Sequence, residues 1–291
     1  MMKPLSLVAI VLTKNEERDL AACLDSLIGV ASEVFVVDSG STGRTVTIAE
    51  ERGAQVLSHV FHSHAVQFNW ALANIPSSCE WILRIDADER LSSELRAELL
   101  EHLPSVGEHV AGFMLPLRIR FLGCRLRWGA SYPIWLLRLF RRGRGSCEDR
   151  LMDEQIVVTG GLVENIHGDL IHEIPKSLME WTTKHNWYAG RECMDTISGR
   201  SDHKRATAPV LRGPPALRRW HKRNVYGRAP LFLRAFLYWA YRYCFRLGFL
   251  DGWAGLIYHF LQSFWYRFLV DAMIYETEKR NPFVGPSEHR R

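Results

Sequence analysis

Paired cysteines are missing from this sequence. Its six cysteines are scattered along the chain, and no two of them form a CxxC pair. This spacing argues against both a zinc ribbon and a disulfide scaffold, and it is typical of a protein in a reducing compartment. A chain of 291 residues that is 47% hydrophobic can instead bury a sizeable core of its own.

Glycine-rich phosphate loops are also missing. Neither GxGxxG nor GxxxxGK[ST] occurs in the sequence, so a dinucleotide-binding or P-loop mechanism has no support. No internal repeat is visible. Long apolar runs are few, and the run at residues 5–12 ends in charge rather than in a small-residue cleavage site. That run therefore predicts a first strand and not a signal peptide.

Charge is distributed unevenly along the chain. The formal net charge is +5, but residues 200–250 contain twelve Lys and Arg against the single acid Asp202, which gives +11 there and −6 elsewhere. A concentrated basic segment needs an anionic partner. The candidates are lipid headgroups, nucleic acid and phosphorylated substrates.

Strand-like and helix-like patterns alternate over the first hundred residues. Apolar or β-branched runs predict strands, and apolar residues at helical spacing predict helices between them. The strands are expected at residues 5–12, 33–37 and 81–85, and the helices at 20–28, 44–52, 66–75 and 92–103, the last with Ser92 as its N-cap. This alternation predicts an α/β fold with an open, mostly parallel sheet flanked by helices.

Later elements are less clearly patterned. Residues 110–140 mix short apolar runs with arginines and glycines, so their elements stay undefined, whereas 156–171 contain strand-like pieces and 175–188 are typical of a helix. Residues 212–215, Arg-Gly-Pro-Pro, are the best linker candidate.

Acidic side chains follow two of the predicted strands. Asp38 and Asp86 each end a strand, and ligands of open α/β sheets bind outside the carboxyl ends of the strands. Asp86 and Asp88 are separated by the small Ala87, so both carboxylates can turn toward one point. Converging carboxylates repel unless a cation lies between them, and hard oxygen ligands suit Mg²⁺ or Mn²⁺ together with substrate phosphates.

Each of these acids has a simpler interpretation. The DxD pair could be a solvated acidic turn, with Glu89 as a charge flanking the next helix. Asp38, which is followed by Ser-Gly-Ser-Thr, could hold an Asx-turn or cap a helix instead of contacting a ligand.

Four motifs in sequence order make the first hundred residues recognisable. They are VLTKNEE (11–17), VVDSGSTGRT (36–45), QFNWAL (67–72) and WILRIDADE (81–89). The set resembles the family 2 glycosyltransferases, specifically the branch similar to lipopolysaccharide-core β-glucosyltransferases. The resemblance is strong over the first hundred residues and looser to about Tyr188.

The resemblance implies a GT-A fold, an inverting sugar transfer and a set of site residues. A divalent metal, Mg²⁺ or Mn²⁺, is implied at Asp88 and Asp86. The residues implied to bind the nucleotide sugar are Thr13, Asn15, Glu16, Asp38, Ser39, Ser41, Gln67, Asn69 and Asp86. The sequence departs from the family at Gly43, where an Asp is common.

An inverting transfer also needs a base for the proton of the acceptor hydroxyl. Related enzymes have a paired acid at about this distance after the DxD, and Glu154 is the first candidate here, followed by Asp153 and Asp149. The alternative is an acidic patch paired with nearby arginines. Arg138 could help to neutralise a diphosphate, or it could belong to a solvated basic strand. His172 is expected to be structural or on the acceptor side.

The carboxy-terminal third predicts two amphipathic helices. In residues 231–247 an arginine or tyrosine recurs every four positions, and in residues 253–275 the polar side chains also gather on one side. Residues 253–270 reach the lower length limit of a membrane span, but their polar stripe argues against a lipid-surrounded helix. We expect residues 211–275 to lie on an anionic membrane surface. The alternative is packing on the catalytic domain or on a second subunit.

These expectations combine into one hypothesis. Residues 1–210 are expected to form a GT-A catalytic domain, with 1–105 binding the nucleotide sugar and 106–210 holding the acceptor and the base, and 211–291 to form membrane-associating helices. The predicted activity is transfer of a sugar from a nucleotide-diphosphate sugar to a lipid-linked saccharide, in lipopolysaccharide or exopolysaccharide synthesis. The expected location is the cytoplasmic face of the plasma membrane. No nucleic-acid partner is expected, and the oligomeric state stays open.

Two alternatives remain. A sugar nucleotidyltransferase also uses paired acids and Mg²⁺, but it normally needs a basic, glycine-rich loop near the first strand, which Thr13-Lys14-Asn15 does not provide. A non-enzymatic protein could bind nucleic acid through its basic, aromatic tail, but this would leave the acidic strand end without a purpose.

Overall fold

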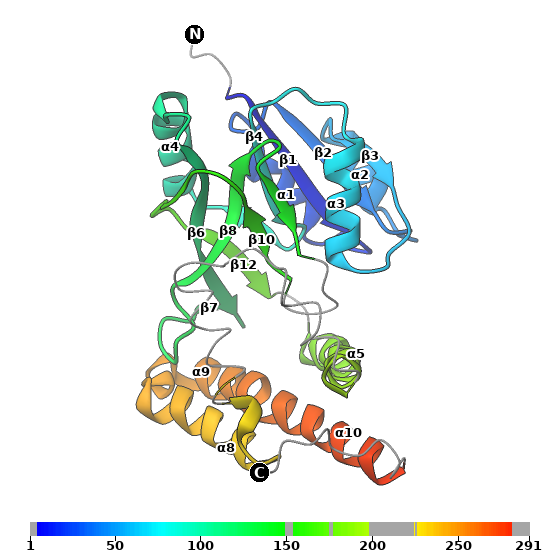
Figure 1. Cartoon of the computed structure of the whole chain (residues 1–291), viewed down its shortest axis with the longest axis vertical. Helices are drawn as coiled ribbons and strands as arrows, with labels where there is room; N and C mark the ends of the chain where they lie inside the picture. The colour runs from blue at the N-terminus through cyan, green and yellow to red at the C-terminus, as the bar shows by residue number, and fades with distance from the viewer. Residues whose placement is uncertain (1–4, 149–153, 175–176, 198–223, 225, 281–291) are drawn as a thin grey trace. The chain divides into compact units, whose positions relative to one another are not determined.

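The computed structural model describes residues 5–148, 154–174, 177–197, 224 and 226–280 (Figure 1). The described residues form two compact units. The first contains residues 5–126, 131–148 and 154–174, and the second contains residues 127–130, 177–197, 224 and 226–280.

A ten-stranded mixed sheet is the centre of the first unit. Its strand order is β3-β2-β1-β4-β8-β6-β12-β5, and β7 and β11 also pair with β6. The strands are β1 Leu7–Thr13, β2 Glu33–Asp38, β3 Gln55–Ser58, β4 Trp81–Asp86, β5 Glu89–Leu91, β6 Val110–Phe121, β7 Cys124–Arg125, β8 Ile134–Arg141, β11 Leu162–Asn165 and β12 Leu170–Ile174. A separate antiparallel pair consists of β9 Gly145–Cys147 and β10 Ile156–Val158.

The sheet changes character in its middle. Neighbouring strands are parallel from β3 through β2 and β1 to β4, whereas β8 pairs antiparallel with both β4 and β6. The predicted α/β fold is confirmed. The strands of the first hundred residues from β1 to β4 pair in parallel, and β6 also pairs in parallel with β11 and β12. The antiparallel part, β6 to β8, comes from the segment whose elements the sequence left undefined.

Helices cover both faces of the parallel part. They are α1 Leu20–Leu27, α2 Thr45–Glu51, α3 His64–Asn74 and α4 Ser93–His102, followed by the 3₁₀ turn Leu103–Ser105. Because side chains alternate along a strand, Leu7 and Ala9 of β1 pack in the same core as α1, α2 and α4, whereas Val8 and Ile10 pack with α3 (Figure 1). Burial on both faces explains why β1 is a continuous apolar run.

The predicted N-cap of α4 gives a first test. Ser92 is buried, and its Oγ accepts a hydrogen bond from the N–H of Leu95 at 3.1 Å. Replacing Ser92 by Ala is expected to cost about 1 kcal/mol of unfolding free energy, because that N–H loses its acceptor. Urea denaturation measures the loss. The neighbouring Ser93→Ala is the control and should cost much less, and an equal cost for both would contradict the cap assignment.

Helices make up most of the second unit. They are α5 Leu178–Ile197, α8 Leu233–Ala240, α9 Gly252–His259 and α10 Tyr266–Arg280, with π-helical turns at Tyr241–Phe245 and Phe260–Trp265 and 3₁₀ turns at Tyr226–Arg228 and Gly248–Asp251. Among the described residues, no helix is both long and apolar enough to cross a membrane.

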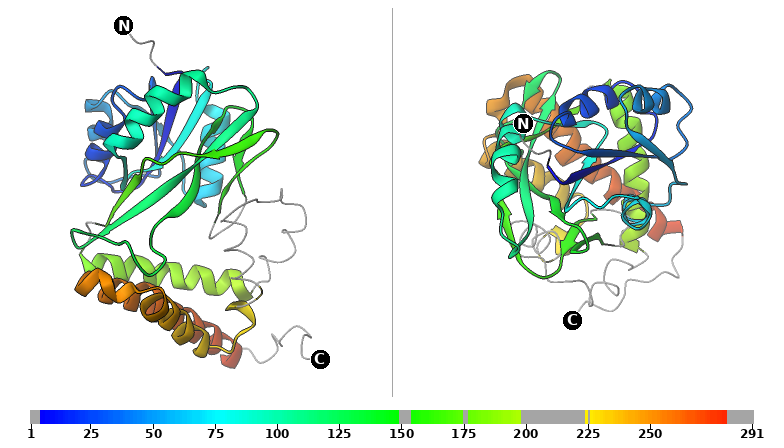
Figure 2. Two further views of the ribbon diagram at one scale, coloured as in Figure 1. Left: turned by 90° about the vertical axis from the view of Figure 1, so that its left-hand side faces the viewer. Right: turned by 90° about the horizontal axis from the view of Figure 1, so that it is seen from above.

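Helix α5 packs along α10. Ala189 and Cys193 of α5 share a core with Tyr266, Val270 and Ile274 of α10, and Figure 2 shows the two helices side by side. The sequence predicts a helix from residue 175 to 188, but α5 continues nine residues further, to Ile197. This segment is predicted to belong to the acceptor region, whereas α5 lies in the second unit. The domain boundary at residue 210 stays a prediction.

The two predicted amphipathic helices of the second unit form, but their arginine-bearing side faces inward. Nε of Arg234 donates to Oδ1 of Asp271 at 2.8 Å, and the Asp271 side chain is fully buried. Nε of Arg242 donates to the carbonyl of Gly129 at 2.7 Å, and its Nη1 donates to Ser263 Oγ at 3.2 Å. The polar stripe therefore forms internal contacts of this unit.

Candidate active site

The carboxyl ends of β1, β2 and β4 meet at one edge of the sheet. Thr13 is in register with Asp38, and Leu12 is in register with Asp86. This follows from parallel pairing, because strands that run the same way end on the same side. The predicted site residues at the ends of these three strands therefore lie at a common edge, as the sequence requires.

Asp38 organises the loop that follows β2. Its carboxylate is buried, and Oδ2 accepts hydrogen bonds from the N–H groups of Gly40 and Ser41, both at 2.9 Å, while Oδ1 accepts from the Ser41 hydroxyl. These contacts are those of the Asx-turn that the sequence left open as the simpler interpretation. Asp38 shapes the loop whether or not it also contacts a ligand.

Asn15 joins the loop after β1 to the loop after β2. Its N–H donates to Ser41 Oγ at 2.8 Å, and its Oδ1 accepts from the N–H of Thr42 at 2.9 Å. Asn15 has φ +55°, a left-handed conformation in which Asn is among the better tolerated residues. Asn15 and Ser41, both predicted to bind the nucleotide sugar, therefore lie side by side and contact each other in this structure.

Gly43, where the sequence departs from the family, lies against Glu17. A Cβ at position 43 would lie 2.5 Å from Oε2 of Glu17. That same oxygen accepts a hydrogen bond from the N–H of Arg44, at the start of α2, at 2.9 Å. A carboxylate is therefore present at this turn, and Glu17 supplies it from the first motif.

The two amides of the QFNWAL motif also have internal partners. Gln67 is buried, and its Nε2 donates to the carbonyl of Val37 at 3.0 Å and to Ser39 Oγ at 2.6 Å. Asn69 makes a reciprocal pair of hydrogen bonds with the backbone of Cys147, both at 2.8 Å. Gln67 therefore fixes the loop beyond β2, and Asn69 fixes β9 against α3.

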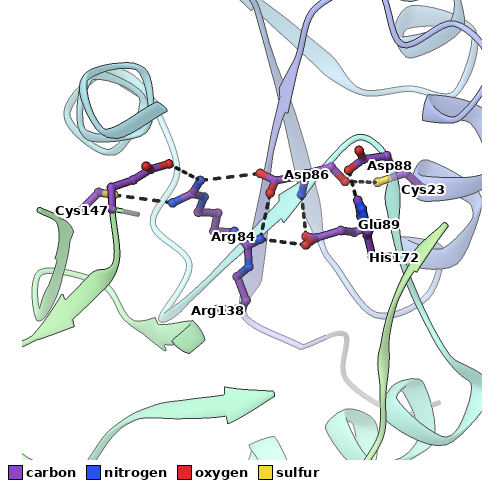
Figure 3. A network of polar contacts seen from close by, with 9 residues as sticks. Cys23, Arg84, Asp86, Asp88, Glu89, Arg138, Cys147 and His172 are labelled. Atoms are coloured by element: carbon purple, nitrogen blue, oxygen red, sulfur yellow. Dashed lines mark hydrogen bonds and ion pairs between the residues drawn. The ribbon is translucent and has the colours of Figure 1, made fainter. Parts of the chain in front are cut away.

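Asp86 and Asp88 point in different directions. Figure 3 shows the Asp86 carboxylate directed toward Arg84 and Arg138, and the Asp88 carboxylate on the other side, with His172. Oδ2 of Asp86 accepts from Nη2 of Arg138 at 2.8 Å, and Oδ1 of Asp88 lies 3.5 Å from Nδ1 of His172. The prediction that both carboxylates turn toward one point is therefore wrong for this structure, in which protein cations lie beside each of them.

Burial and the neighbouring charges together shift the pKa values of this cluster. Burial acts to raise the pKa of Asp86, but the charges of Arg138 and Arg84 outweigh it and hold that pKa well below its usual range. Burial raises the pKa of Glu89 to about 7 despite the opposing charge of Arg138. Burial acts to lower the pKa of His172, but the charge of Asp88, with those of Glu89 and Asp86, raises it to about 9.

Glu89 is part of this cluster rather than a flanking charge of the next helix. Its side chain is 3% exposed, Oε1 accepts from Nη2 of Arg138 at 2.8 Å, and Oε2 accepts from the N–H of Asp86 at 2.9 Å. Arg138 thus binds Asp86 and Glu89 together, and the solvated acidic turn is not what forms. Arg138 itself is nearly buried, so it does not belong to a solvated basic strand.

Glu154, the first candidate for the base, lies next to the same cluster. Its Oε1 is 3.5 Å from Nη2 of Arg84, and Nη2 of Arg84 is also 3.8 Å from Oδ1 of Asp86. The Glu154 side chain is only 12% exposed. Arg84 therefore links the predicted base to the DxD motif across seventy residues of sequence. Asp149 and Asp153, the other two candidates, lie outside the described residues.

One carboxylate oxygen at this edge is available to a hard divalent cation whose remaining ligands come from a substrate. Oδ1 of Asp86 is buried and accepts no hydrogen bond in the described structure. Within the described ranges, no three His, Cys, Asp or Glu side chains converge as a metal site. Such a partial set suits Mg²⁺ or Mn²⁺, which bind through one or two carboxylates and substrate phosphates.

Sequence reasoning missed Arg84 and His172 as members of the cluster. A signal for Arg84 was present, because a charged residue inside an otherwise apolar, buried strand needs a nearby acid. No local signal existed for His172, because β12 reaches the cluster through its pairing with β5, where His172 is in register with Glu89.

Much of this chain is similar in sequence to known proteins. Residues 8–149 match glycosyl transferase family 2. The lipopolysaccharide core biosynthesis glycosyltransferase LpsC of Rhizobium meliloti is 28% identical over 269 residues, which cover 90% of this chain and 92% of that protein. An uncharacterised glycosyltransferase of Rickettsia prowazekii is 40% identical over 198 residues, 64% of this chain and 66% of that protein.

A solved structure with a similar outline is a mannosyltransferase of Pyrobaculum calidifontis in complex with GDP-Man and Mn²⁺. It is 15% identical and has a TM-score of 0.49, over 98% of this chain and 89% of that one. A glucosyl-3-phosphoglycerate synthase of Mycobacterium tuberculosis, in complex with Mn²⁺, UDP and glucosyl-3-phosphoglycerate, is 19% identical with a TM-score of 0.37, over 60% of this chain and 74% of that one.

Proposed function

Since residues 8–149 belong to glycosyl transferase family 2, we propose that this protein is an inverting, metal-dependent glycosyltransferase. It transfers a sugar from a nucleotide-diphosphate sugar to a saccharide acceptor. The observation that carries this proposal is the Arg84 contact, which holds the carboxylate of Glu154 beside Asp86 at the carboxyl edge of the parallel strands.

Glu154 is proposed as the base. It accepts the proton of an acceptor hydroxyl while the acceptor oxygen forms a bond to the anomeric carbon. The bond between that carbon and the diphosphate oxygen breaks on the opposite face, and the nucleoside diphosphate leaves with its electron pair. Arg84 orients the Glu154 carboxylate, and the low exposure of this side chain keeps competing water away from it.

The loops after β1 and β2 are proposed to bind the nucleotide. Thr13 contributes a buried hydroxyl that makes no hydrogen bond in the described structure, and the Asn15–Ser41 contact holds the two loops together. Glu16, Asp38, Ser39, Gln67 and Asn69 complete this proposed set. When bound, a divalent cation held by Asp88 and Asp86 would neutralise charge on the diphosphate.

The acceptor is proposed to be a lipid-linked saccharide of the lipopolysaccharide core, handled at the cytoplasmic face of the plasma membrane. The support is the relative LpsC, a lipopolysaccharide core biosynthesis glycosyltransferase that this chain matches over 92% of its length. The direct test is nucleotide release from a panel of sugar nucleotides, with and without truncated lipopolysaccharide as acceptor. Absence of acceptor-dependent release from every donor would contradict the proposal.

Nucleotide binding has a test that does not depend on the acceptor. UDP or GDP with Mn²⁺ is expected to raise the melting temperature, because a ligand at about 100 times its Kd stabilises the folded state by about 2.7 kcal/mol. A chelator should remove most of the rise. Asp88→Ala should abolish it, whereas the control Asp25→Ala, which removes a surface partner of Arg52, should keep it. An equal rise in both variants would exclude Asp88 from the metal site.

A further inference from the structure

Residues 233–268 in the second unit expose apolar side chains. Phe245 is 79% exposed and Trp253 is 80% exposed. In this segment, all of which the structure describes, Arg246 is the one charged residue among the exposed positions. We define the apolar face by six of these side chains: Phe236, Leu237, Phe245, Phe249, Trp253 and Phe260.

The polar side chains of the same helices are inside. Asp271 and His259 are fully buried, Arg234 pairs with Asp271, and Arg242 donates to Gly129 and Ser263. A helix that lies in water has the opposite polarity, with charges outward and apolar residues inward. Helices surrounded by lipid instead keep their ionisable residues inside, paired with one another or with backbone carbonyls.

The charge of the residues that precede these helices in the sequence indicates which kind of surface the apolar face contacts. Residues 200–228 contain nine Lys and Arg against the single acid Asp202. Basic segments next to an amphipathic helix are attracted to anionic lipid headgroups. A second copy of this chain that docked through the same segment would bring like charges together, which opposes that pairing.

We propose that the apolar face inserts into an anionic bilayer, with the helices lying in the plane of the interface. Trp253 and Phe245, the most exposed members, enter the boundary between headgroups and acyl chains. An in-plane position agrees with the finding that no described helix is long and apolar enough to span. The inference rests on the proposed function in one respect, which is that the acceptor is linked to a lipid. Insertion of the apolar face can nevertheless be tested without measuring sugar transfer.

Vesicle flotation of the full chain is the test. The unaltered protein is expected to float with phosphatidylcholine vesicles, and more strongly when phosphatidylglycerol is added. Phe245→Glu combined with Trp253→Glu should lower the partition coefficient by about two orders of magnitude, because burial of each aromatic side chain contributes roughly a factor of ten or more. The matched control combines Ile28→Glu with Leu162→Glu, two exposed apolar residues of the first unit, and should float like the unaltered protein.

Salt separates insertion from purely electrostatic docking. Raising salt from about 0.1 M to about 1 M shortens the screening length from ~10 Å to ~3 Å. If the protein binds through its apolar face, high salt should remove only the additional binding that phosphatidylglycerol provides. Complete release at high salt together with no binding to phosphatidylcholine would overturn the proposal.

Three further outcomes are decisive. A stable dimer that the Phe245→Glu and Trp253→Glu pair dissociates, without any vesicle binding, would assign the apolar face to a second copy and overturn the proposal. Nucleotide release without vesicle binding would overturn the inference and leave the proposed function standing. Vesicle binding without nucleotide release from any donor would support the insertion and contradict the activity.

Discussion

Replacing Glu154 by Gln is expected to lower turnover by about 10²–10⁴-fold while the nucleotide sugar still binds. The amide keeps the size of the side chain but cannot accept the proton of the acceptor hydroxyl. Arg84, which lies 3.5 Å from Glu154, is already beside Asp86, so the site should keep its shape. Turnover is measured as acceptor-dependent nucleotide release, and donor binding as the rise in melting temperature.

Variants of three other acids serve as comparisons for Glu154→Gln. Glu164→Gln, on β11 in register with Phe113 of β6, should leave turnover nearly unchanged. Asp149→Asn and Asp153→Asn test the other two candidates for the base, which lie outside the described residues. If one of these abolishes turnover while Glu154→Gln stays active, the base is not Glu154, and Glu154 has only the role of an ion-pair partner of Arg84.

Replacing Asp271 by Ala is expected to cost about 3–5 kcal/mol of unfolding free energy, because it leaves the buried guanidinium of Arg234 without a counter-charge. Asp271 is fully buried, and it also accepts the N–H of Phe232 at 2.8 Å. Phe232 has φ +65°, so this contact holds a backbone conformation that a bulky residue rarely adopts. Urea denaturation followed by helical circular dichroism measures the loss.

Two comparisons separate the buried pair from an ordinary surface pair. Glu276→Ala removes the exposed partner of Arg280 on the same helix, where both side chains are more than half exposed, and should cost less than about 0.5 kcal/mol. Asp271→Leu combined with Arg234→Met removes both charges and should recover much of the loss. If Asp271→Ala costs as little as Glu276→Ala, the buried ion pair of the second unit contributes no stability. The statement that the polar side chains of these helices face inward, on which the apolar face depends, would then lose its support.

Local sequence patterns defined the parallel part of the sheet. β1, β2 and β4 begin and end within two residues of the expected runs, because strands buried on both faces are continuously apolar. The same patterns located α3 and α4, and the Ser92 cap was predicted correctly. β3, a four-residue strand with exposed ends, was missed because so short an edge strand has no distinctive pattern.

Long-range pairing decided what the patterns left undefined. β6 and β8 are consecutive partners in space, but their register shifts between Phe113 and Met114, and arginines interrupt their apolar runs. Those arginines are explained only by the partners that the fold brings to them. Arg138 lies between Asp86 and Glu89, about fifty residues earlier in the chain.

The sequence by itself determined the sheet edge on which Asp38 and Asp86 meet, because parallel strands end on the same side, and its four ordered motifs predicted the family that residues 8–149 match. Only the tertiary structure decided what neutralises the acids and which side of the carboxy-terminal helices faces outward. Both depend on charges far apart in sequence, such as Arg84 with Glu154 and Arg234 with Asp271. Helical spacing reveals that a helix has two faces, but burying one of them depends on a partner for its charges, and that partner is known only from the folded chain.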